Sequence, residues 1–317
     1  MTTTDPAPPL AVDVQDVAVH YGRTRALDGV SLTIPPGAIT GLLGRNGSGK
    51  TTLLSLLAAL RRPTRGRVLV GGKDPFDDEA LMEQICLVRE SGDVLADEPL
   101  AVNLRYLASA RPAWDEELAG RLLDLFELPT KTAVNKLSRG QRSAFGVIAG
   151  LASRAPLTML DEVHLGMDAP SRYAFYDVLL EDYIAHPRTI VLSTHLISEL
   201  DKLLEHVVVL HRGTVLLTSD ADDLRARGAA VTGRAEEVDA ALSSAGALTV
   251  LAERSLGGTK QVTVMGEGGA LPRSTVEGLR DAGLEIGPVE LQDLFVHLTD
   301  TRRPAGAGAE DHTGRTR

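Results

Sequence analysis

The sequence predicts an α/β fold, because short apolar runs typical of buried strands alternate with longer segments of helical periodicity. Three β-like runs open the chain, at residues 11–21, 26–34 and 38–44. The third run ends in a glycine-rich loop, and residues 50–60 follow it as an apolar helix. A strand, a glycine-rich loop and a helix in this order predict an anion site at one edge of a sheet.

Helix formers dominate the next part of the chain. Residues 100–110 and 115–128 predict two helices, which we assign to an inserted helical subdomain of about residues 91–140. The helix after this insertion carries a core-facing stripe: Phe145, Ile148, Ala149 and Ala152. Residues 156–162 and 188–195 then predict short strands of a buried parallel sheet, and residues 206–216 predict two more strands.

The pattern changes after about Ser219. Residues 247–254 and 260–266 alternate apolar and polar side chains around a "SLGGT" turn and predict a hairpin. A helix predicted at residues 290–300 has its apolar side chains on one stripe: Leu291, Leu294, Phe295 and Leu298. We expect a main domain, a small C-terminal α+β region and two disordered tails, at residues 12–220, 221–300, 1–11 and 301–317 respectively.

Composition excludes several classes of function. The formal net charge is −10, which gives no electrostatic reason to expect nucleic-acid binding. Cys86 is the only cysteine, so no intrachain disulfide is possible, a cytosolic setting fits best, and the thiol is expected to be a small buried hydrophobe. The apolar runs fall short of the ~18 residues that a membrane-spanning helix needs, and residues 1–9 do not form a secretory signal. Any role at a membrane must therefore depend on a partner.

The stretch "GRNGSGKTT" fits the phosphate-loop pattern in the correct context, between a predicted strand and a predicted helix. Backbone N–H groups of such a loop wrap a phosphate, Lys50 supplies a positive charge, and Thr51 offers a hydroxyl to Mg²⁺. The alternative is a glycine-rich turn with no ligand. The residues expected to contact the nucleotide are Gly44, Arg45, Asn46, Gly47, Ser48, Gly49, Lys50, Thr51 and Thr52.

Polar side chains end two other predicted strands. Asp161 and Glu162 follow one buried strand, where a first carboxylate can hold Mg²⁺ and a second can polarise the attacking water. His195 ends the next strand, on the same edge of the sheet. Tyr21 closes the first strand and is placed either to stack on a purine ring or simply to pack at the sheet edge.

A second anion site is predicted in "KLSRGQRSAF", residues 136–145. A hydroxyl, a guanidinium, a glycine and an amide precede an apolar helix, whose first turn presents unpaired N–H groups. The residues concerned are Ser138, Arg139, Gly140 and Gln141. Two phosphate-binding sites in one chain require an explanation.

The order of Tyr21, "GRNGSGKTT", "LSRGQ", "TMLDE", "GMD" and "LSTH" resembles the nucleotide-binding subunit of ATP-binding cassette (ABC) transporters, over roughly residues 12–220. The resemblance implies a P-loop ATPase core: a mixed sheet, an antiparallel β subdomain and a helical insertion. It also implies ATP and Mg²⁺ as ligands, hydrolysis by Glu162, Lys50 and His195, and Mg²⁺ held by Thr51 and Asp161. The ending "VELQDLFVHLTD" is similar to that of subunits serving drug-export systems.

The resemblance explains the second anion site. In this family two subunits meet head to tail, so Ser138 and the backbone at Gly140 would bind the γ-phosphate held by the neighbour, and Asp168 in "GMD" would link the two sites. The implied partners are a second ATPase subunit and a separate membrane-spanning permease, with the chain peripheral on the inner, cytoplasmic face of the membrane.

Three departures qualify the resemblance. Glu90 stands where the family usually has a glutamine that binds Mg²⁺ and senses the membrane partner, so the resemblance assigns Glu90 as a metal ligand. Arg139 replaces a glycine, and either adds positive charge near the phosphates or points to solvent. Val163 replaces a proline. The rival functions are a soluble cassette ATPase acting on ribosomes or DNA, and an ATP sensor that does not hydrolyse.

Overall fold

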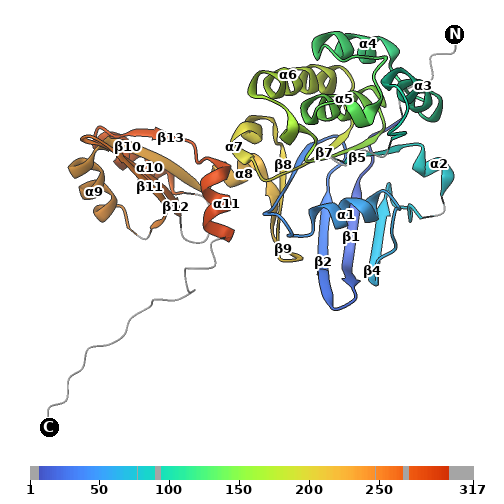
Figure 1. The fold of residues 1–317 in the computed structure, drawn as a ribbon. Helices are drawn as coiled ribbons and strands as arrows, with labels where there is room; N and C mark the ends of the chain where they lie inside the picture. The colour runs from blue at the N-terminus through green and yellow to red at the C-terminus, as the bar shows by residue number, and fades with distance from the viewer. Residues whose placement is uncertain (1–6, 77, 90–93, 247, 267–270, 300–317) are drawn as a thin grey trace. The chain divides into compact units, whose positions relative to one another are not determined.

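The computed structural model describes residues 7–76, 78–89, 94–246, 248–266 and 271–299. The chain divides into two compact units, Met1–Ala226 and Arg227–Arg317 (Figure 1). The short helix α8 (Ala221–Arg225) belongs to the first unit, six residues beyond the boundary expected from sequence. Its first N–H donates to the carbonyl of Glu205, and Arg225 pairs with Asp201 at 2.9 Å, so backbone and charge both hold it there.

A three-stranded antiparallel sheet opens the first unit, in the order β2-β1-β4. Its strands are β1 (Val12–Tyr21), β2 (Thr24–Ile34) and β4 (Arg65–Val70). Leu10 and Ala11, which the sequence assigned to a disordered lead-in, are held before β1. The carbonyl of Ala11 accepts from the N–H of Gly71, and the Leu10 side chain packs against the core, because burying it removes apolar surface from water.

A six-stranded mixed sheet lies at the centre of the unit, in the order β5-β6-β7-β3-β8-β9. All its neighbouring strands run parallel except β8 and β9. The strands are β3 (Ile39–Leu43), β5 (Ile85–Arg89), β6 (Leu157–Asp161), β7 (Thr189–Thr194), β8 (His206–His211) and β9 (Thr214–Asp220). Every residue of β3, β6 and β7 is buried, which explains their continuous apolar runs.

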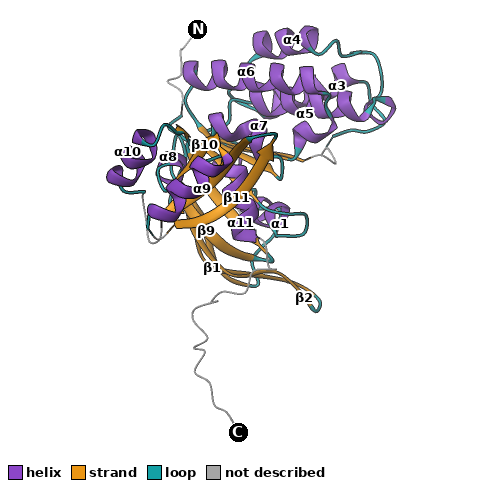
Figure 2. Cartoon of the chain, turned by 90° about the vertical axis from the view of Figure 1, so that its left-hand side faces the viewer, coloured by secondary structure: helices purple, strands orange, loops and turns teal. Residues whose placement is uncertain are grey.

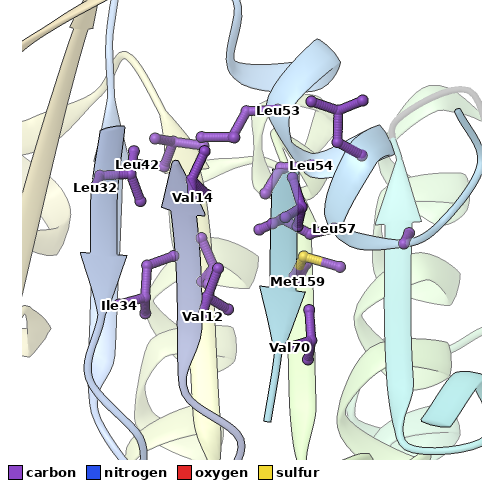
Figure 3. Close-up of a cluster of buried hydrophobic side chains, with 14 of the residues drawn as sticks. Val12, Val14, Leu32, Ile34, Leu42, Leu53, Leu54, Leu57, Val70 and Met159 are labelled. Atoms are coloured by element: carbon purple, nitrogen blue, oxygen red, sulfur yellow. The ribbon is translucent and has the colours of Figure 1, made fainter. Parts of the chain in front are cut away.

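Helix α1 (Lys50–Leu57) packs between the two sheets. Figure 3 shows its leucines Leu53, Leu54 and Leu57 among side chains of both sheets, including Val12 and Met159. This cluster fixes the start of α1, because a helix anchored by its apolar face cannot shift relative to the sheets without exposing that face. The glycine-rich loop before α1 is therefore held at a fixed place.

The helical part of the unit packs around α5 (Arg139–Ala152), as Figure 2 shows. The stripe predicted for this helix is confirmed, since Phe145, Ile148, Ala149 and Ala152 are all buried. Its neighbours include α3 (Leu100–Ala110), α4 (Glu116–Leu125) and α6 (Ala169–Ala185). The shorter helices of the unit are α2 (Glu79–Met82), η1 (Val134–Lys136), η2 (Val163–Gly166), α7 (Ile197–Leu200) and η3 (Asp201–Leu203).

The second unit is a small α+β module. Its elements are β10 (Gly228–Arg234), α9 (Ala235–Ser244), β11 (Leu248–Leu256), β12 (Thr259–Gly266), α10 (Arg273–Asp281), β13 (Glu285–Gly287) and α11 (Leu291–Thr299). The antiparallel order β11-β12-β10-β13 makes the first six elements a βαββαβ arrangement of the ferredoxin-like type. The predicted hairpin is confirmed as β11 and β12, which pair from Leu256 and Thr259 back to Leu248 and Gly266.

Candidate active site

The carboxyl ends of three parallel strands meet at one edge of the central sheet. Strand β3 pairs with β7, with Leu43 opposite Thr194, and β7 pairs with β6, with Ser193 opposite Asp161. The segments that follow these strands carry the glycine-rich loop, Glu162 and His195. Parallel pairing in this register therefore brings together side chains that are far apart in the sequence.

The glycine-rich loop can take its course only with glycine at two of its positions. A Cβ on Gly44 would lie 2.7 Å from the carbonyl oxygen of Leu210, and a Cβ on Gly49 would lie 2.8 Å from that of Ala26. Gly49 also has φ 108°, which other residues rarely adopt. The loop leads directly into the first turn of α1, and the N–H groups of a first helical turn have no partner within the helix, which suits an anion.

Lys50, Glu162 and His195 form a compact charged cluster. The Lys50 ammonium lies 3.1 Å from Glu162 Oε1 and donates to the carbonyl of Gly44 at 2.8 Å. The same carboxylate oxygen lies 3.3 Å from His195 Nδ1. Burial raises the pKa of Glu162, but Lys50 and His195 together outweigh that effect, so its pKa lies below the ordinary value and the carboxylate is ionised at neutral pH.

Thr51 and Asp161 form a second polar pair beside this cluster. The Thr51 hydroxyl donates to Asp161 Oδ2 at 2.6 Å. The other carboxylate oxygen, Asp161 Oδ1, is buried and has no hydrogen-bond partner within the described part of the chain. A buried carboxylate oxygen without a donor costs stability unless something else binds it, and an oxygen-seeking cation is the natural candidate.

The residues of "LSRGQ" gather at a different place. Ser138 caps α5: its hydroxyl accepts from the Gln141 N–H at 3.2 Å, and the Gln141 side chain accepts from the Ser138 N–H at 3.0 Å. Ser138, Gly140, Gln141 and Asp168 line one surface depression of about 300 Å³, whose described lining residues include neither Lys50 nor Glu162. One chain thus presents two separate groups of candidate phosphate-binding residues.

The remaining predicted residues have varied settings. Tyr21 is 47% exposed, and the Arg61 guanidinium stacks on its ring at 3.9 Å from the centroid. Arg45 and Asn46 are exposed in the loop, Ser48 is buried, and Thr52 is half-buried in the first turn of α1. Glu90 lies outside the described residues.

Sequence reasoning missed a layer of side chains behind the cluster. His164 is 1% exposed and contacts the Thr194 hydroxyl at 3.0 Å. Arg172 donates to both oxygens of Glu199, at 2.7 and 2.8 Å. Arg172 follows Asp168 by four residues and Glu199 follows His195 by four. This four-residue spacing is the only feature of the sequence that points to the ion pair. It can be interpreted only once the two segments are known to be adjacent.

Comparison with known proteins decides the family. A family model described as ABC transporter matches residues 27–164. The daunorubicin resistance ATP-binding protein DrrA3 of Streptomyces coeruleorubidus is 30% identical, over 92% of this chain and 97% of its own length. The chain belongs to the ABC transporter family. The P-loop ABC core predicted from sequence is thereby confirmed.

Two further comparisons refine the assignment to ABC transporters. A solved structure of the ATP-binding subunit of an ABC transporter is 26% identical with TM-score 0.60, over 68% of this chain and 91% of that one. The mycobactin import ATP-binding/permease protein IrtB of Mycolicibacterium thermoresistibile is 33% identical over 69% of this chain, which spans only 39% of that protein. A match over nearly the full length of both chains is thus to a drug-resistance protein, and the chain is the ATP-binding and ATP-hydrolysing subunit of an exporter-type ABC transporter.

ABC transporter ATPases generally dimerise and pair with membrane-spanning permeases. No helix within the described ranges of this chain is long and apolar enough to cross a membrane.

Proposed function

We propose that Glu162 polarises the water that attacks the γ-phosphate of ATP. The observation that supports this most directly is the cluster of Lys50, Glu162 and His195 beside the first turn of α1. A carboxylate kept ionised by a neighbouring ammonium can accept a proton from water. When ATP binds, its phosphate gives Lys50 a second anion to contact, which leaves Glu162 Oε1 available to the water.

Thr51 and Asp161 fit a Mg²⁺ site. Their oxygens adjoin at 2.6 Å, and the buried Asp161 Oδ1 has a lone pair that no described hydrogen-bond donor uses. A bound Mg²⁺ would neutralise charge on the β- and γ-phosphate oxygens. The chain's own part is to fix the two oxygens: β6 ends at Asp161, and α1 holds Thr51 in its first turn. Glu90 stays a proposed third ligand.

We further propose that the depression lined by Ser138, Gly140 and Asp168 receives the nucleotide bound to a second subunit. Its separation from Lys50 supports this, because an anion site at the start of α5 cannot serve a phosphate held elsewhere on the same chain. ATP would then lie between two chains, with the phosphate loop of one and "LSRGQ" of the other on opposite sides. His195 would contact the γ-phosphate from the side of the phosphate loop.

A groove in the helical part is our candidate for the permease contact. It has a volume of about 240 Å³ and lies between β5, α3 and α5, with an apolar lining that includes Leu87, Leu107 and Phe145. Arg89, Arg111 and Arg142 also line it, as does Tyr106, which is 57% exposed. An amphipathic helix with an acidic residue would suit this combination. The chain would thus lie on the cytoplasmic face of a membrane and power export of a drug-like compound, as the resistance relative suggests.

Replacing Glu162 by glutamine tests the catalytic assignment. The amide keeps the shape of the side chain but cannot take a proton from water, so we expect ATP to bind while hydrolysis falls by about 100-fold or more. Phosphate release and equilibrium dialysis with labelled ATP measure the two steps, and size-exclusion chromatography with ATP should show an accumulated dimer. Glu181→Gln, an exposed glutamate on α6, is the matched control. Hydrolysis at the wild-type rate by the Glu162 variant would remove the assignment.

The groove is tested by Tyr106→Asp on α3, with Ile184→Asp on α6 as control, since Ile184 is also exposed, at 70%. The added charge opposes burial of this surface against an apolar helix. We expect the Tyr106 variant to bind inside-out vesicles of the source cells less well, so that less of it sediments with them. Its ATPase activity in solution should persist. Equal sedimentation of both variants would show that the groove is not the permease contact.

A further inference from the structure

The segment that ends at Asp168 is tied to helix α6, which follows it. Asp168 caps α6, accepting from the Ser171 N–H at 3.0 Å. The carbonyl oxygen of the preceding residue, Met167, accepts from Arg172 Nη1 at 2.8 Å. Arg172 lies one turn into α6, so the backbone before Asp168 is held by a side chain rather than by the helix ladder.

The same guanidinium holds a second segment. Arg172 Nε and Nη2 bind the two carboxylate oxygens of Glu199 at 2.7 and 2.8 Å, which is the bidentate geometry that fixes a carboxylate in orientation as well as in distance. Glu199 lies on α7, four residues after His195, and also accepts from the Tyr176 hydroxyl at 3.1 Å. Both partners of the ion pair are largely shielded from water, at 19% and 23% exposure.

A parallel link joins the same two segments closer to the sheet. The Thr194 hydroxyl, just before His195, contacts His164 at 3.0 Å and accepts from the Leu196 N–H at 2.9 Å. His164 lies in η2, between Glu162 and Met167. The stretch from Glu162 to Asp168 and the stretch from Thr194 to Glu199 are therefore joined at both ends.

We propose that Arg172 is a positioning residue that makes the Asp168 segment and the His195 segment move together. The proposal rests on the proposed function, in which Asp168 meets a second subunit and His195 contacts the γ-phosphate. A displacement of the Met167 carbonyl at the subunit contact then reaches His195 through Arg172 and Glu199, and the converse holds for a displacement of His195. The contact between subunits and the orientation of His195 are thereby set by one side chain.

Arg172→Lys tests this directly. Lysine keeps the charge, but its single ammonium cannot reproduce the planar fork that serves Met167 and both Glu199 oxygens at once. We expect kcat to fall by about tenfold with KM and the melting temperature close to wild type, because the loss is of orientation and not of ATP binding. Tyr176→Phe is the matched control: it removes one bond to Glu199, leaves Arg172 in place, and should retain most of kcat.

A second measurement reads the coupling itself without depending on turnover. In nitrogen-labelled protein, Asp168→Ala should shift the backbone amide signals of Leu196–Leu200 in the wild-type background and leave them in place when Arg172→Lys is also present. If the Arg172 variant folds poorly, Glu199→Gln is the alternative substitution, and we expect it to break the same coupling. Unchanged kcat together with persistent shifts in the Arg172 variant would overturn the proposal. Wild-type hydrolysis by Glu162→Gln would instead show that the proposed function had failed.

Discussion

Glu162 has φ 55°, in the left-handed region that residues other than glycine rarely occupy. The strained backbone comes directly after β6 and before η2, where the chain reverses away from the sheet. It is compatible with a carboxylate that meets both Lys50 and His195 instead of extending to solvent. Strain of this kind persists where surrounding packing fixes it, which is common at functional sites.

His164 makes the stability of the protein depend on pH. Burial lowers its pKa to about 4 from the ordinary 6.5, and the charges of Glu199 and Glu162, which raise it, do not reverse the effect. The unfolded chain therefore binds a proton more readily, and the free energy of unfolding decreases as pH falls from about 6.5 toward 4. Between pH 7.5 and 5.5 we expect His164 to account for a loss of about 1.3 kcal/mol.

Urea titration of the wild type and of His164→Gln at both pH values measures this. Glutamine places an amide nitrogen near the position of the ring Nε2 and can keep the contact with Thr194, but it does not titrate. The variant should therefore lose about 1.3 kcal/mol less than the wild type over the same interval. Equal losses in the two proteins would show that His164 stays neutral in both states or is already protonated when folded.

At the scale of elements, one side chain at the start of α5, that of Ser138, has two roles. Ser138 completes a capping box with Gln141, and such a cap is worth about 1 kcal/mol. The same hydroxyl lines the depression proposed to receive the neighbour's phosphate. A substitution meant to test phosphate binding must therefore preserve the cap. Aspartate does so, because it is among the best N-cap residues, and it places a negative charge where a phosphate would lie.

The elements most fully predicted from sequence are those whose side-chain pattern is local. The "LAVNLRYLASA" run became α3 from Leu100 to Ala110, because helical periodicity is a property of neighbouring residues. The joining of η2 to α7 through His164, Arg172 and Glu199 could not be predicted, because it depends on the register of β6 against β7. The pairing of Lys50 with Glu162 has the same origin. Sequence identified both residues, but not the contact between them.

At the scale of the whole molecule, the two units differ in what they share with relatives. The match to the daunorubicin resistance protein covers 92% of the chain and so extends into the C-terminal unit, whereas the match to the mycobactin import protein covers 69%. The C-terminal unit has a hydrophobic core built from its own residues, which include Val231, Val262 and Leu279. The sequence anticipated its α+β character and its hairpin. The order β11-β12-β10-β13 arises from pairing between distant segments and was not predicted.

The proposed head-to-tail arrangement can be tested by mixing two defective chains. Lys50→Ala removes the ammonium from the phosphate loop, and Ser138→Asp repels the phosphate from the capping motif while keeping α5 capped. Each variant alone should form homodimers in which both composite sites are damaged, so each should show little ATPase activity. Arg142→Asp, which reverses a charge in the first turn of α5 outside the described lining of the depression that contains Ser138, is the control for nonspecific effects of the carboxylate. Arg142 lines the proposed permease groove, which ATPase activity in solution does not require.

Mixing the Lys50 and Ser138 variants redistributes the damage between sites. If Ser138 acts on the nucleotide of the neighbouring chain, one composite site of the mixed dimer carries both substitutions and the other carries neither. Half of the chains in a one-to-one mixture pair in this way if association is random, so about a quarter of all composite sites should be intact. ATPase activity should then return toward a quarter of the wild-type value when one intact site supports turnover. A mixture of wild-type chain with excess Lys50→Ala measures independently whether one intact site does so.

If Ser138 served its own chain's nucleotide, every site would carry one substitution and the mixture would stay inactive. Inactivity in a mixture whose mixed dimers are demonstrated by differently tagged chains, when the wild-type mixture shows that one intact site supports turnover, would therefore exclude the head-to-tail arrangement.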